Sequence, residues 1–190
     1  MKALGADVRE VDLPYAQEAL AVYYVLVPAE VSANLSRFDG IRYGSRAQAE
    51  TLLDVYERSR EEGLGTEVRR RILLGTYVLS KGYVDAYYRK ARKVRRLIAG
   101  AYEHLFKEVD MLMMPTAPNV AFKIGEKIND PLAMYLEDVF TVGVNVAGVP
   151  AISIPCGREE GTNLPIGIQL IAKRFDDGRL LSWAHAYEKV

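Results

Sequence analysis

Cysteine is almost absent from this sequence, which contains only Cys156 among its 190 residues. A single thiol excludes an intramolecular disulfide and a cysteine-rich zinc site. Cys156 ends an apolar strand-like stretch, and we expect a small buried residue there rather than a nucleophile. The two histidines, His104 and His185, have no metal-ligand partner at a fixed spacing. We therefore interpret both as structural and predict no metal site.

Long apolar runs and a net charge are also missing. No apolar run reaches the about 18 residues of a membrane-spanning helix, and the first residues lack the apolar core of a secretory signal. The chain has 25 basic and 25 acidic residues, so its formal net charge is zero. A neutral protein has no general attraction to DNA or to an anionic membrane. We expect a cytoplasmic protein without a membrane partner.

Helices and strands intermix along the chain, which predicts an α/β fold with a mixed sheet and flanking helices. No linker-like stretch divides the sequence, so we expect a single domain over residues 1–190. Expected strands cover residues 6–13, 110–115, 150–157 and 164–172. Expected helices cover residues 15–38, 47–61, 67–80, 84–109, 131–148 and 177–188, and a helix tail ends at Gly5. Pro28 should kink or divide the first of these helices.

The stretch "TEVRRRILLGT" places one arginine in a special position. At about 100° per residue, Arg71 lies on the same helix side as Gly75, while its two arginine neighbours turn away. Glu67 stands four residues earlier, the favourable orientation for an ion pair with Arg71. A glycine inside a helix often has a reason, and close approach of a ligand beside Arg71 would be one. An arginine held in this way suits a carboxylate; the alternative is a solvated basic helix face.

The stretch "YLEDVFTVGVNVAG" offers a carboxylate on the flank of an apolar helix face. Glu137 should point away from that face, whereas Asp138 could border a cavity. Asp138 is either a surface residue or a partner for a substrate ammonium group. Together with Arg71, it would then recognise the two charged groups of a free amino acid.

The run "RKARKVRR" at residues 89–96 could contact phosphates. Its apolar residues, Ala91 and Val94, are spaced as in a helix with a solvated basic face, which is the interpretation we prefer. No aromatic residues are interleaved for base stacking. An RNA-binding module is kept as an alternative of a different class.

Several ordered segments resemble the amidase signature family. They are "PAEVSANLSRFDGIRYG", "GTYVLSKGYVDAYYRKARKVR", "PTAP", "NVAGVPAISIPCG" and "PIGIQLIAKRFDD". The resemblance runs over about residues 4 to 189. The first two segments are most similar to the branch of A subunits of the glutamyl-tRNA(Gln) and aspartyl-tRNA(Asn) amidotransferases, which are carbon–nitrogen ligases.

The resemblance implies a part in glutamine-dependent transamidation. Such an A subunit hydrolyses glutamine and passes ammonia to the B subunit, which uses ATP and Mg to amidate mischarged Glu-tRNA(Gln) or Asp-tRNA(Asn). The small C subunit forms a heterotrimer with these two, and the tRNA is bound mainly through the B subunit. The alternative within the family is a hydrolase that acts on another small amide.

The resemblance also implies which residues are present and which are not. The family's Ser-Ser-Lys triad lies in a glycine- and serine-rich segment that has no counterpart in this sequence. We therefore expect residues 1–190 to be the carboxyl-terminal part of a single amidase signature domain, inactive alone and without catalytic residues. Arg71 and Asp138 match the residues that hold the carboxylate and ammonium of glutamine, and Tyr23 matches a pocket residue. The loop "NLSRFDGIRYG" is expected beside that pocket and toward the B subunit.

Overall fold

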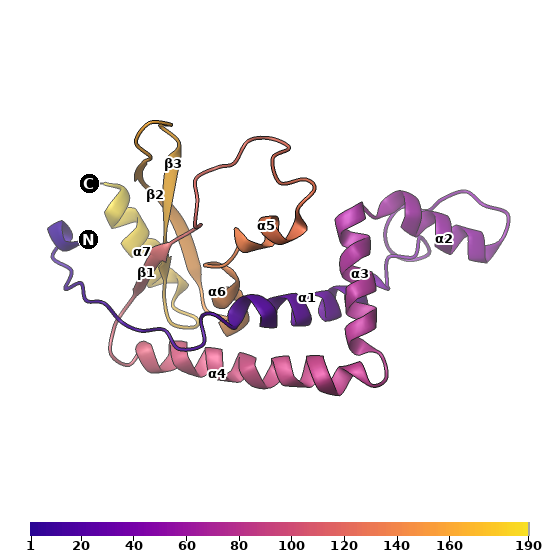
Figure 1. The fold of residues 1–190 in the computed structure, drawn as a ribbon, viewed down its shortest axis with the longest axis horizontal. Coiled ribbons are helices and arrows are strands. Elements are labelled where there is room, and N and C mark those ends of the chain that lie inside the picture. Colours follow the sequence, from indigo (N-terminus) through magenta and orange to yellow (C-terminus); the bar gives the residue numbers. More distant parts are fainter. Residues whose placement is uncertain (190) are drawn as a thin grey trace. The chain divides into compact units, whose positions relative to one another are not determined.

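Residues 1–189 are described by the computed structural model, and they form two compact units (Figure 1). Residues 1–20, together with the chain from residue 94 onward, form what we call the sheet unit. Residues 21–93 form the helical unit. The predicted α/β class, with a sheet and flanking helices, is confirmed, but the three strands in the described residues pair antiparallel rather than as a mixed sheet. The single domain expected from the sequence stays a prediction.

The sheet is antiparallel, with the strand order β1-β3-β2. Its strands are β1 (Leu112–Pro115), β2 (Ala151–Arg158) and β3 (Pro165–Ile171). In the central strand β3, Leu170 pairs with Met113 on one side and with Ile152 on the other. The three strands were predicted because each is a short apolar run that ends at proline, glycine or a polar turn.

Helix α7 (Asp177–Glu188) packs against β2 and β3 (Figure 1). Leu180 and Ala184 lie four residues apart on one helix face and contact a buried cluster that includes Ile154 and Leu170. Burial of an aliphatic side chain of leucine or isoleucine size stabilises the fold by about 1.5–3 kcal/mol. This core therefore holds the strands in register.

Three further helices belong wholly or mainly to the sheet unit: α4 (Lys90–Leu105), α5 (Pro131–Leu136) and α6 (Val142–Ala147). Tyr102 of α4 is 2% exposed, and burial raises its pKa to about 12. A Cβ added at Gly143 of α6 would lie 3.4 Å from the Tyr102 hydroxyl, so the two helices approach closely here. α6 ends at Gly148, whose φ of +74° suits glycine and whose N–H donates to the carbonyl of Val144.

The helical unit contains α2 (Leu52–Gly63), α3 (Thr66–Leu79), the π-helix η2 (Val84–Arg89) and most of α1 (Ala19–Leu35). The α1 helix continues through Pro28, so this proline does not divide it, and the alternative expectation of a kink stays a prediction. Residues 84–89 were expected to be α-helical but form the π-helix that precedes α4. The N-cap residue of α3 is Gly65, and no side chain donates or accepts a capping hydrogen bond at this helix end.

Two other expectations fail in the sheet unit. Residues 6–13 form no strand, and Val8 and Val11 are exposed; the preceding turn, Lys2–Leu4, is 3-10 helix and ends at Gly5 as expected. Alternation of apolar residues indicates which faces a strand would have, but a strand also needs a neighbour to accept its backbone hydrogen bonds. The helix expected over 131–148 is interrupted by turns at residues 137–141.

Among residues 1–189, no helix combines the length and apolar character that a membrane crossing requires.

Candidate functional site

Arg71 lies on α3 of the helical unit and is held by a glutamate one turn earlier. Glu67 is in the first turn of α3, where a carboxylate also interacts favourably with the helix dipole. The Nε of Arg71 donates to Oε1 of Glu67 at 3.0 Å, which confirms the pair expected from their spacing. The side chain of Arg71 is 28% exposed, compared with 49% for that of Arg70. Arg71 is therefore the more enclosed of the two, as the helix geometry predicted.

Tyr23 on α1 reaches the same guanidinium. Burial acts to lower the pKa of Arg71, but hydrogen bonds with Glu67 and Tyr23 outweigh it and raise the pKa above its ordinary value. The Tyr23 ring also packs edge-on against Tyr24, with centroids 5.2 Å apart. The structure thus brings together Arg71 and Tyr23, which are 48 residues apart and were both predicted to be site residues.

Gly75, one turn after Arg71, has a different role from the one expected. A Cβ at this position would lie 2.5 Å from the carbonyl carbon of Pro28, closer still to its oxygen, and 2.7 Å from Cβ of Ser32. The hydroxyls of Ser32 and Thr76 are hydrogen bonded at 2.9 Å beside this contact. The space beside Gly75 is filled by the backbone of α1, and the predicted approach of a ligand there is wrong. A glycine inside a helix indicates that another group approaches the helix backbone closely, but the sequence does not show whether this group is a ligand or another helix.

The guanidinium of Arg71 can still bind a carboxylate. It has five N–H donors, of which Nε is used by Glu67, and the Tyr23 side chain lies close enough to help raise the pKa of the group. Donors therefore remain for an anion. Because the side chain is already held on two sides, it would lose little conformational freedom on binding one.

Asp138 lies in the turn between α5 and α6 of the sheet unit, and its side chain is exposed. Its backbone carbonyl accepts hydrogen bonds from the N–H groups of Thr141 and Val142 at 3.0 and 3.1 Å. Asp138 therefore comes just before the start of α6, instead of lying within one long helix.

Glu137, which was expected to point away, is the more enclosed of the two acids. Its side chain is 15% exposed and accepts hydrogen bonds from Lys127 and, at 3.1 Å, from Asn119. The contact with Lys127 is the main cause that lowers the pKa of Glu137. The expectation failed because the helix ends at residue 136, so the 100° spacing no longer applies to the residue that follows.

The turn that carries Asp138 is also fixed to the sheet. Gln169 of β3 is 3% exposed, and its amide nitrogen donates to the carbonyl of Phe140 at 2.9 Å. Lys127 lies over the ring of Phe122 with its ammonium 4.8 Å from the centroid. These contacts were missed, because a lysine or glutamine far along the chain carries no local signal of its partner.

The loop at residues 34–44 is ordered mainly by its own residues and by α2. Asp39 accepts a hydrogen bond from the N–H of Ile41 at 2.9 Å, and Gly40 adopts a φ of +78°. Arg37 and Arg42 are exposed. This internal order accounts for the aspartate and the glycine but not for the two arginines.

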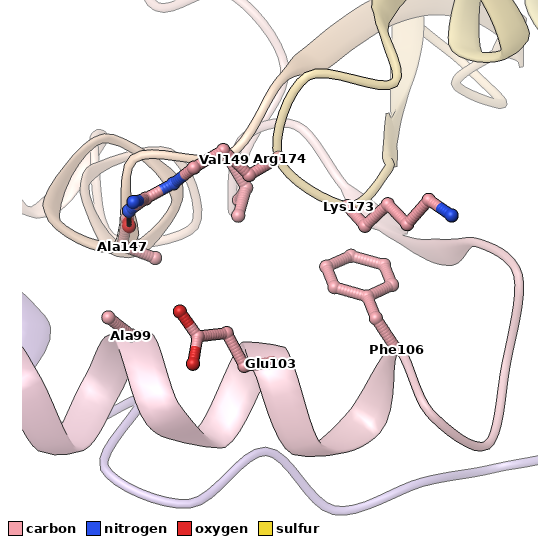
Figure 2. A pocket seen from close by; sticks show the side chains of 7 residues that line it. All are labelled: Ala99, Glu103, Phe106, Ala147, Val149, Lys173 and Arg174. Atoms are coloured by element: carbon pink, nitrogen blue, oxygen red, sulfur yellow. Dashed lines mark hydrogen bonds between the residues drawn. The ribbon is translucent and has the colours of Figure 1, made fainter.

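A cavity of about 230 Å³ lies in the sheet unit, lined by residues from α4 and from the segments that follow α6 and β3 (Figure 2). Arg174 donates to the carbonyls of Ala147 and Gly148, so it satisfies the carboxyl end of α6. Glu103 lines the cavity from α4. None of the predicted site residues lines this cavity.

The cysteine and the histidines do not form a site. Cys156 is exposed, so the expectation of a buried thiol is wrong; it lies in β2 at the register shift between Pro155 and Gly157. His104 is exposed on α4 and lies 3.4 Å from the carboxylate of Glu108. Within residues 1–189, no three His, Cys, Asp or Glu side chains are grouped so that they could hold a metal ion.

Arg71 and Asp138 belong to different units, so their convergence on one amino acid stays a prediction. What the structure gives is the local setting of each: Arg71 with Glu67 and Tyr23 in the helical unit, and Asp138 in a fixed turn of the sheet unit.

Comparison with known proteins identifies the family. The family model named Amidase matches residues 1–181. The chain is 58% identical over 187 residues to the A subunit of the glutamyl-tRNA(Gln) amidotransferase of Caldanaerobacter subterraneus, and 57% identical over 189 residues to that of Parvibaculum lavamentivorans. The matches cover 98% and 100% of this chain, but the chain spans about 38% of the length of these relatives.

Solved structures agree with this result. The crystal structure of the A subunit of the glutamyl-tRNA(Gln) amidotransferase from Thermotoga maritima is 41% identical, with a TM-score of 0.65 over 94% of this chain and 34% of its own. A crystal structure of an amidase matches the fold with a TM-score of 0.71 at 23% identity, covering 99% of this chain and 38% of that one. The chain therefore belongs to the amidase family.

Proposed function

We propose that this chain is part of a glutaminase subunit that supplies ammonia from glutamine for the transamidation of Glu-tRNA(Gln) or Asp-tRNA(Asn). It contributes the wall of the pocket that binds glutamine. The observation that carries the proposal is the Arg71 guanidinium, fixed by Glu67 and Tyr23 and still able to donate to a carboxylate. The names of the similar A subunits support the same reaction.

Within this proposal, each predicted residue has a defined role. Arg71 binds the α-carboxylate of glutamine through a charge-assisted pair of hydrogen bonds. Asp138 binds the α-ammonium group, and Tyr23 shapes the pocket beside Arg71. The Ser-Ser-Lys triad lies in the part of the full-length protein that this sequence does not contain, so we expect this chain alone to hydrolyse no glutamine.

The proposed assembly is a cytoplasmic heterotrimer with the B and C subunits of the amidotransferase. The B subunit holds most of the mischarged tRNA and uses ATP and Mg, and this chain binds no cofactor. Ammonia is then the only link between glutamine hydrolysis, in the A subunit, and amidation, in the B subunit. That link allows the two reactions to be measured separately, because added ammonium salt can replace glutamine.

The test is the replacement Arg71→Ala in the complete complex. Loss of a charge-assisted contact costs about 1.5–3 kcal/mol, and about 1.4 kcal/mol corresponds to a tenfold change. We therefore expect the KM for glutamine to rise roughly tenfold to a hundredfold, while transamidation with ammonium salt is unchanged. An unchanged KM for glutamine would exclude the proposed carboxylate contact.

The alternative is a family member that hydrolyses another small, uncharged amide. Such a substrate has no α-carboxylate, so Arg71 would have another role. A panel of amides with and without the amino-acid group, assayed on wild-type and Arg71→Ala enzymes, separates the two. A glutamine enzyme loses its preference for the amino acid, whereas the alternative enzyme has none to lose.

A further inference from the structure

We propose that Glu67 is a positioning residue that orients Arg71 for the substrate carboxylate, an inference that rests on the proposed function. An arginine side chain is long and flexible, and its bidentate contact with a carboxylate depends on the orientation of the guanidinium plane. Glu67 accepts the Nε hydrogen bond of Arg71 at 3.0 Å from the preceding helix turn. A contact at Nε restrains the orientation of the group, and the four Nη hydrogens remain to serve both Tyr23 and the substrate carboxylate.

A carboxylate beside the binding group could repel the substrate carboxylate, and the structure shows how this charge is offset. Oε1 of Glu67 accepts from Arg71, and Oε2 accepts from Nη1 of Arg70 at 2.6 Å. The three side chains together carry a formal charge of +1, so an anion is still attracted. Glu67 therefore orients Arg71 without cancelling its charge.

A second role of Glu67 must be distinguished from positioning. Its negative charge in the first turn also interacts with the helix dipole. Aspartate would keep this charge but is one methylene shorter, so it cannot reach Nε in the same geometry. Glutamine would lose the charge but keeps both the length and an oxygen that accepts a hydrogen bond. If Glu67 acts by positioning Arg71, Glu67→Asp raises the KM for glutamine more than Glu67→Gln does. If its charge at the helix dipole is what matters, the order is reversed.

The experiment compares Glu67→Asp, Glu67→Gln and Glu67→Ala in the complete amidotransferase complex. We expect the KM for glutamine to rise about tenfold for the aspartate and alanine variants and less than threefold for the glutamine variant. We expect kcat at saturating glutamine, and the rate with ammonium salt, to stay within about twofold of wild type. The ammonium-dependent rate also confirms that each variant folds and assembles.

Arg69→Ala provides a matched control. Arg69 is exposed on the same helix, and its replacement alters one charge while the hydrogen bond from Arg71 to Glu67 is kept. We expect this variant to keep the wild-type KM. The double variant Glu67→Asp/Arg71→Ala should be no worse than Arg71→Ala alone, because a positioning residue acts only through the residue it orients.

Each outcome separates one hypothesis from the other. If Arg71→Ala raises the KM for glutamine and Glu67→Asp does not, the positioning role is overturned and the proposed function stands. If the aspartate variant retains a better KM than the glutamine variant, the charge matters more than the geometry and the positioning role is overturned as well. If Arg71→Ala leaves the KM unchanged, the proposed function fails and the positioning role fails with it.

Discussion

Gly75→Ala tests whether the contact between α1 and α3 sets the geometry of the candidate site. The added Cβ would lie 2.5 Å from the carbonyl carbon of Pro28 and 2.7 Å from Cβ of Ser32, whereas ordinary contact begins at 3.4 Å. Closing that difference requires α3 to move away from α1 by about 1 Å for the carbonyl carbon, and by more for the closer Pro28 oxygen. Neither the backbone of Pro28 nor the Cβ of Ser32 can turn aside as the end of a flexible side chain could.

The expected energetic cost follows from two opposing effects. Overpacking of a well-packed contact costs about 1–3 kcal/mol. Alanine has a higher helix propensity than glycine by about 1 kcal/mol, which offsets part of this cost. We therefore expect the free energy of unfolding to fall by about 0–2 kcal/mol, toward the upper end of this range because the added Cβ meets backbone atoms of Pro28. A shift of this size would also lengthen the 2.9 Å hydrogen bond between Ser32 and Thr76 and separate Tyr23 from Arg71.

The assay is urea unfolding of the complete complex, with hydrogen exchange to locate the change in α1 and α3, followed by glutamine kinetics. We expect faster exchange in both helices and a KM for glutamine that rises severalfold. Gly100→Ala is the control, since Gly100 lies within α4 with no atom within 4 Å of an added Cβ, and its replacement should be neutral or stabilising. If Gly75→Ala unfolds like wild type and keeps its KM, the close helix contact does not position the site.

Two predictions concern the turn that carries Asp138. Lys127→Ala removes the main partner of Glu137 and so loosens the turn, and we expect a severalfold rise in the KM for glutamine. Lys123→Ala, at a nearby exposed lysine, is the control and should leave this KM unchanged. Equal KM values for the two variants would contradict a role of Lys127 in fixing the turn that carries Asp138. Because the pKa of Glu137 is lowered in the fold, its ionised form contributes stability above its unfolded pKa of about 4.3, and this contribution is lost as the pH falls through the folded value. The stability difference between wild type and Glu137→Gln in urea should therefore be largest near pH 7 and shrink toward pH 3, and a difference independent of pH would refute the assignment.

Local sequence signals predicted the elements that depend on local chemistry. The helix start expected at residue 131 is confirmed: Asp130 caps α5, and its carboxylate accepts from the N–H of Ala133 at 3.0 Å. The expected helix end at residue 148 is confirmed, and the structure shows Gly148 there in the left-handed conformation. These features require only residues a few positions apart, so they can be inferred without knowledge of the fold.

The predictions that were wrong concern segments whose structure depends on contacts with residues far away in the sequence. The strand expected at residues 6–13 has the right alternation, but Arg9 instead donates to the carbonyl of Glu108, 99 residues away. The expected division of α1 at Pro28 failed because the helix packs against α3 at this point, where Gly75 allows close contact. A single sequence contains no direct record of these long-range contacts.

The contacts of the candidate site also fall into local ones, which the sequence predicts, and long-range ones, which it does not. The pair Glu67–Arg71 was predictable because residues four apart on a helix are neighbours. The contact of Arg71 with Tyr23 depends on the packing of two helices, and Tyr23 was identified only through the resemblance of its segment to a family. The partners of Glu137 were not predictable, because they depend on the path of the connection between β1 and α5 (Figure 1).

The energetics of the Arg71 pair favour an interpretation in terms of recognition rather than stability. Partly exposed ion pairs typically contribute about 0–1 kcal/mol to folding, and the side chains of Glu67 and Arg71 are 43% and 28% exposed. The pair therefore adds little to the stability of α3, while its geometry restricts the guanidinium to one plane. The Nη donors of Arg71 are the groups that would bind a substrate carboxylate under the proposed function. The glutamine KM of Arg71 and Glu67 variants therefore decides between the two proposed activities.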